Sequence, residues 1–60
     1  MSGDVTKRAV AVYIEREKAA MKTPQGADHD AIIEQVAAEF GISSRTLADA
    51  VLDATAARAI

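Results

Sequence analysis

Apolar residues recur along this 60-residue chain at helical spacing, in three segments separated by turn-forming residues. In the first segment these positions are Val10, Tyr13, Ile14, Ala20 and Met21. Asp4 is expected to cap this helix, and Lys22 suits its carboxyl end because a lysine there complements the helix dipole. The pattern predicts a helix over about residues 5–22, followed by a break at Thr23-Pro24-Gln25-Gly26.

Two further helices are predicted after this break. Asp28 or Asp30 is expected to cap a helix over residues 29–40, and a third helix is expected over residues 44–58. The short strand-like alternation near Val10 lies inside the first predicted helix, so it does not change the assignment. The expected fold is all-α: one domain over residues 1–60 that forms a small three-helix bundle.

The junction between the second and third predicted helices is the most specific part of the sequence. Glycine takes the left-handed backbone conformation that closes a helix, and a serine at the next helix start accepts a bond from a free amide. The residues in these roles and around them are Ala37, Gly41, Ile42, Ser43, Thr46 and Leu47. Residues 33–52 thereby resemble a helix-turn-helix of the bacterial repressor and recombinase type. Any compact helical bundle also needs a helix stop and a helix start.

The resemblance implies binding of double-stranded DNA, with the third helix in the major groove. The candidate contacts on that helix are Ser44, Arg45, Ala48 and Asp49. Lys7, Lys18 and Lys22 on the first helix are candidate contacts to the phosphate backbone, although lysines on a solvated face also serve solubility. Asp49 and Asp53 oppose DNA binding, because they place negative charge on the exposed face of the third helix.

The large share of alanine among the apolar residues favours self-association. Half of the 60 residues are hydrophobic, and 14 of those 30 are alanine, so a lone chain has a thin core. A homodimer would cover apolar surface that one copy leaves exposed. The candidate contact residues are Val5, Ala9, Val12 and Arg16 on the first helix and Leu52 and Ala56 on the third. Arg16 and Glu17 interrupt the apolar sector of the first helix, and they either meet local partners or pair across chains.

Net charge leaves a second class of function open. The net charge is −2, and nonspecific affinity for nucleic acid comes mainly from basic residues. Residues 1–27 carry five basic and three acidic side chains, giving +2, whereas residues 28–60 carry two basic and six acidic ones, giving −4. The alternative function is therefore an acidic helical module that binds another protein or further copies of itself, without nucleic acid.

The sequence offers little for other chemistry. Asp28-His29-Asp30 is the one cluster of ligand-type residues, but successive helical residues point 100° apart and no second histidine or cysteine completes a metal site. We therefore expect no metal, no cofactor and no enzymatic activity. Without cysteines, an apolar span or a signal-peptide pattern, the expectation is a cytoplasmic protein that does not enter the membrane.

Overall fold

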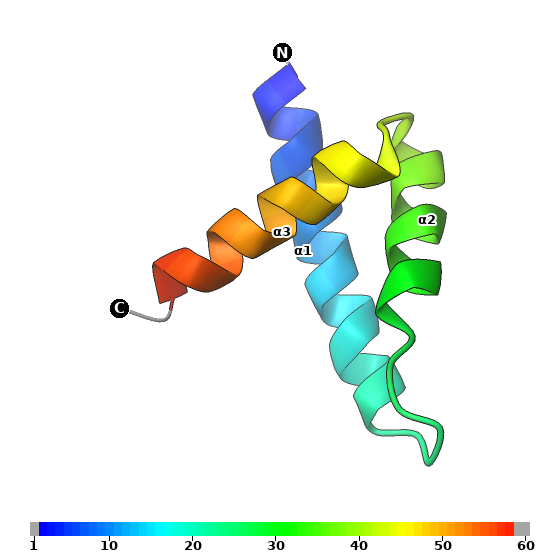
Figure 1. The fold of residues 1–60 in the computed structure, drawn as a ribbon. Coiled ribbons are helices and arrows are strands. Elements are labelled where there is room, and N and C mark those ends of the chain that lie inside the picture. The colour runs from blue at the N-terminus through cyan, green and yellow to red at the C-terminus, as the bar shows by residue number, and fades with distance from the viewer. Residues whose placement is uncertain (1, 59–60) are drawn as a thin grey trace.

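The computed structural model describes residues 2–58, with side chains for residues 4–56. The chain forms three helices, α1 (Ser2–Met21), α2 (His29–Phe40) and α3 (Ser44–Arg58), and the described residues contain no strand. This confirms the predicted all-α fold of three helices. Helices α1 and α2 lie side by side in opposite directions, and α3 crosses the N-terminal half of α1 (Figure 1).

The bounds of α2 and α3 are those that the sequence predicts. Asp28 caps α2: its backbone is extended, and its Oδ1 accepts a hydrogen bond from the amide of Ala31 at 3.2 Å. Of the two aspartates considered for this role, the structure selects Asp28. Asp30 lies inside the first turn of α2, where a negative charge is favourable for the helix dipole.

Helix α1 differs from its prediction at both ends. It begins at Ser2 instead of residue 5, so Asp4 lies within its first turn and is not its cap. It ends at Met21, because the Thr23 hydroxyl and amide both donate to the carbonyl of Ala20, at 2.6 and 3.0 Å. Pro24 also disfavours a helical backbone at the residue before it, which reinforces this stop.

The core takes side chains from all three helices and is shallow. Its buried members are Ala9, Tyr13, Ile32, Val36, Ala37 and Leu47. Half-buried apolar side chains surround them, and the Cα envelope measures 37 × 30 × 15 Å, so the core is about one layer of side chains deep. Large apolar side chains left on the surface are Val5, Met21 and Leu52.

The buried position of Ala9 corrects one prediction. Ala9 was expected at an oligomer contact, but it has no exposed surface because it packs inside the chain's own core. A small residue at this position lets the neighbouring helices approach α1 closely. Within residues 2–58, the structure has no helix both long and apolar enough to cross a membrane.

Candidate nucleic-acid interface

A three-residue turn, residues 41–43, joins α2 to α3 and sets their relative direction. Gly41 adopts the left-handed conformation, with φ 67° and ψ 29°. The Gly41 amide donates to the carbonyl of Ala38 at 3.3 Å, and the Ile42 amide donates to the carbonyl of Ala37 at 3.0 Å. These two bonds form a Schellman motif, which satisfies carbonyls that a helix end otherwise leaves unpaired.

Ser43, the residue before α3, caps the helix as predicted. Its Oγ accepts from the amide of Thr46 at 3.0 Å and donates to the Thr46 hydroxyl at 2.7 Å. The Ser43 carbonyl accepts from the amide of Leu47 at 3.1 Å, the first bond of the helix proper. Ile42 packs against the core between the two helices, so the turn is fixed by hydrogen bonds and by burial.

The first turns of α3 present the predicted contact residues to solvent. Ser44, Arg45 and Asp49 are exposed, whereas Ala48 is half-buried. The first turn of α3 carries no acidic residue, and no carboxylate among residues 4–56 forms an ion pair with Arg45. Asp49 follows Arg45 by about 6 Å along the axis, at 1.5 Å per residue, so the acidic charge lies farther along the helix.

The three candidate lysines do not share one location relative to α3, and Lys22 follows the end of α1 instead of lying on it. Lys7 lies on the N-terminal half of α1, where it lines a groove beside Thr46 and Asp53 of α3. Lys18 lies near the other end, about 16 Å farther along the axis by the helical rise, and Lys22 comes just after that end. Figure 1 shows that this end of α1 is away from α3. All three side chains are exposed, but only Lys7 is close to α3.

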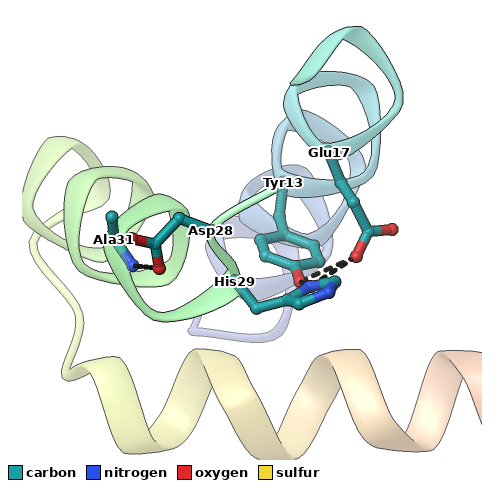
Figure 2. A network of polar contacts seen from close by, with 5 residues as sticks. All are labelled: Tyr13, Glu17, Asp28, His29 and Ala31. Carbon is teal, nitrogen blue, oxygen red and sulfur yellow. Dashed lines mark hydrogen bonds and ion pairs between the residues drawn. The ribbon is translucent and has the colours of Figure 1, made fainter. Parts of the chain in front are cut away.

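A second polar feature joins α1 to the start of α2 (Figure 2). The Tyr13 hydroxyl donates to Glu17 Oε2 at 3.0 Å, and His29 Nδ1 lies 2.8 Å from both of these oxygens. The phenol has one hydroxyl hydrogen, and it donates this hydrogen in the bond to the Glu17 carboxylate. Both histidine contacts are therefore satisfied when Nδ1 carries a proton and donates it.

The environment of Tyr13 changes its acidity. Burial first, then the hydrogen bond to Glu17 and the negative charges of Glu17 and Asp30, raise the pKa of Tyr13 from 10.0 to about 12. Tyr13 is 3% exposed, so its ring is part of the core. Its hydroxyl forms the polar link between the two helices. This network ties the start of α2 to α1.

Arg16 meets a partner within its own chain. Its Nη1 and Nη2 donate to Glu39 Oε2 and Oε1 at 2.6 and 2.8 Å, a two-bond pair between α1 and α2. The hydrogen bond raises the pKa of Arg16 and lowers the pKa of Glu39. Glu17 also has local partners, so both charged residues that interrupt the apolar sector are explained by contacts within one chain.

These two polar links show what the sequence did and did not reveal. Tyr13 and Glu17 are four residues apart on one helix, a spacing that signals contact. His29 and Glu39 lie 16 and 23 residues from their partners, and nothing in the order of residues indicates those pairs.

Among the described residues no cluster of three or more ligand-type side chains is placed to hold a metal ion.

The other residues predicted at an oligomer contact come from two helices and differ in exposure. Val12 is half-buried against the core, and Val5 lies at its edge with 37% of its surface exposed. Leu52 is 68% exposed, and Ala56 is also exposed. Leu52 and Ala56 follow Arg45 by seven and eleven residues, so they share its face of α3.

Comparison with known proteins finds no family model, no curated protein and no solved structure that matches this chain.

Proposed function

We propose that this chain binds double-stranded DNA through α3, as a homodimer that regulates transcription. The observation that carries the proposal is the turn at residues 41–43, where a left-handed glycine and a serine cap hold Ser44 and Arg45 exposed at the start of α3. Helix-turn-helix proteins use a short, glycine-containing turn of this kind to direct a second helix into the major groove.

Electrostatics favour an approach to DNA by the first turn of α3. The amide groups at a helix start carry partial positive charge, and Arg45 adds a full one. Asp49 and Asp53 lie one and two turns farther along, about 6 and 12 Å from Arg45 by the helical rise. An end-on approach keeps both carboxylates farther from phosphate than a lengthwise approach would.

The dimer follows from the weak electrostatics of one copy. With a net charge of −2, a single chain has little general attraction for a polyanion. Two copies that read two half-sites combine their affinities, and the half-sites are expected about one helical turn of DNA, roughly 34 Å, apart. The proposal depends on Ser44 and Arg45 and does not require the lysines of α1.

The test is selection of a preferred duplex from a randomised pool, followed by titration of that duplex at low salt. Arg45→Ala is expected to weaken binding by about 1–3 kcal/mol if the guanidinium makes a bidentate contact to guanine. Lys22→Ala is the matched control, because it also removes one exposed positive charge but at the far end of α1. Failure to enrich any duplex, or equal losses in the two folded variants, would contradict the proposal.

A second candidate function is an acidic helical module that binds a protein without DNA. The observation that favours it is Leu52, which is 68% exposed on the same face of α3 as Arg45 and Asp49. An exposed leucine beside acidic side chains suits a protein surface better than a phosphate backbone. Under this alternative no duplex is enriched, and replacement of Leu52, not of Arg45, abolishes partner binding.

A further inference from the structure

A groove of about 570 Å³ runs between the N-terminal half of α1 and α3. Its lining includes Lys7 and Val10 from α1 and Thr46, Ala50, Asp53 and Ala54 from α3. The floor is apolar and half-buried, because Val10, Ala50 and Ala54 lie there. The lining residues of α3 lie one, five, eight and nine residues after Arg45. At 100° per residue these positions form a flank of α3 next to the face that carries Arg45 and Leu52.

Opposite charges line the two sides of this groove. Lys7 is exposed on the α1 side and Asp53 is exposed on the α3 side. Neither forms an ion pair within residues 4–56, so the two groups do not neutralise each other across the groove. An occupant that fits must therefore offer an acidic group to one side, a basic group to the other, and apolar surface between them.

A second copy of this chain meets that requirement by symmetry. In a twofold dimer the same patch occurs on both copies, and each contact occurs twice with the roles exchanged. If two grooves face each other, Lys7 of each copy meets Asp53 of the other copy, and the alanines of the two α3 helices allow close approach. A DNA occupant would instead place phosphate beside Asp53.

We infer that this groove is the homodimer contact, with paired Lys7–Asp53 bridges between copies. The inference rests on the proposed function, because the groove would be the contact surface of the dimer proposed there. It also gives Lys7 a role other than contact with phosphate. The dimer surface then lies on the flank of α3, so the exposed start of α3 stays available, unlike a contact built on Leu52 and Ala56.

The test measures association of the full chain without DNA, by sedimentation equilibrium over a range of concentrations. Lys7→Glu and Asp53→Lys each convert two attractive pairs into two repulsive ones, so each variant alone should dimerise about tenfold more weakly or worse. Lys22→Glu and Asp49→Lys make the same charge changes away from the groove and should leave association unchanged. Circular dichroism checks that all four variants remain helical.

Mixing the two groove variants gives the sharpest result. In a heterodimer of Lys7→Glu with Asp53→Lys, each pair again joins opposite charges, so the mixture should associate more tightly than either variant alone. A role of these residues within one chain could not be restored by mixing. The inference is overturned if the unmodified chain stays monomeric at millimolar concentration, or if mixing restores nothing. Because DNA is absent, either result is independent of whether the chain binds a duplex.

Discussion

At the scale of single residues, the molecule depends on a few positions whose backbone or burial admits few alternatives. Gly41 is the clearest, because the turn between α2 and α3 needs a positive φ there. An added Cβ at Gly41 would meet no atom within 4 Å, so space is not the constraint. The constraint is the backbone itself, since residues with a Cβ are disfavoured in the left-handed conformation.

Gly41→Ala should therefore destabilise the chain by about 1–2 kcal/mol, the usual cost of a left-handed backbone for a residue with a Cβ. Gly41→Asn should cost less, because asparagine tolerates this conformation better. Urea denaturation followed by circular dichroism measures both effects. Gly26→Ala tests the same backbone cost at a second site: Gly26 also has positive φ and open space around it, so a similar loss is expected there. A stable Gly41→Ala variant would show that the turn can relax.

The turn was predictable from sequence at this scale because its determinants are local. Gly41, Ser43 and Thr46 act on atoms no more than five residues away, and the roles assigned to Gly41 and Ser43 from sequence are the ones that the structure shows. Ala9 was misplaced for the opposite reason. Its burial depends on how α1 packs against its neighbours, and an alanine in an alanine-rich helix carries no local sign of that contact.

At the scale of the helices, two polar links fix α2 against α1 at different points. Arg16 pairs with Glu39 near the end of α2, and Tyr13 with Glu17 meets His29 at its start. The Arg16–Glu39 pair is largely exposed, so we expect it to orient the helices more than to stabilise them. The Tyr13 link is partly buried and is the one with a measurable consequence.

Tyr13 is the only tyrosine in the chain, so its ionisation is read directly from near-ultraviolet absorbance. The unfolded chain is expected to lose this proton near pH 10.0, whereas the folded chain should keep it to about pH 12, because the pKa of Tyr13 is raised in the fold. The contribution of the neutral Tyr13 phenol to the free energy of unfolding is therefore complete below pH 10, and it is lost as the pH rises toward 12. Its size is of order 2–3 kcal/mol, from about 1.4 kcal/mol per pKa unit.

Comparison with a tyrosine-free chain isolates this effect. In Tyr13→Phe the loss of stability between pH 10 and 12 should be smaller than in the unmodified chain, because the remaining change comes from other groups. A phenolate transition near pH 10 in chains that circular dichroism shows to be folded would contradict the assignment. The link itself could not be predicted, since the contact with His29 requires the antiparallel placement of α1 and α2.

At the scale of the whole molecule, the thin 15 Å envelope leaves a core of six buried side chains among residues 4–56 to hold three helices together. Over residues 44–56 of α3, Leu47 is the one side chain in this group, and it has no exposed surface. The predicted fold and the bounds of α2 and α3 were correct because they follow helical periodicity and local caps. Which side chains of α1 face which helix was not predictable, because its apolar sector covers more than one neighbour.

Leu47→Ala should destabilise the chain by about 2–5 kcal/mol, since it removes a fully buried side chain and leaves a cavity. Small domains have little stability to lose, so the variant is expected to be largely unfolded at 25 °C. Leu52→Ala makes the same chemical change at a position that is 68% exposed and should alter stability by no more than about 0.5 kcal/mol. Thermal denaturation distinguishes the two. Similar losses in both variants would mean that α3 is packed differently.

The connection over residues 22–28 has a consequence for how this protein tolerates change in length. It is exposed along most of its course and lies at the end of the molecule away from α3 (Figure 1). Lengthening a flexible connection is inexpensive, at about 0.6 kcal/mol for each doubling. A fluorescent peptide or a tethered second domain could therefore be inserted near Gln25 while the junction of α2 and α3, about 18 Å away by the length of α2, keeps its geometry.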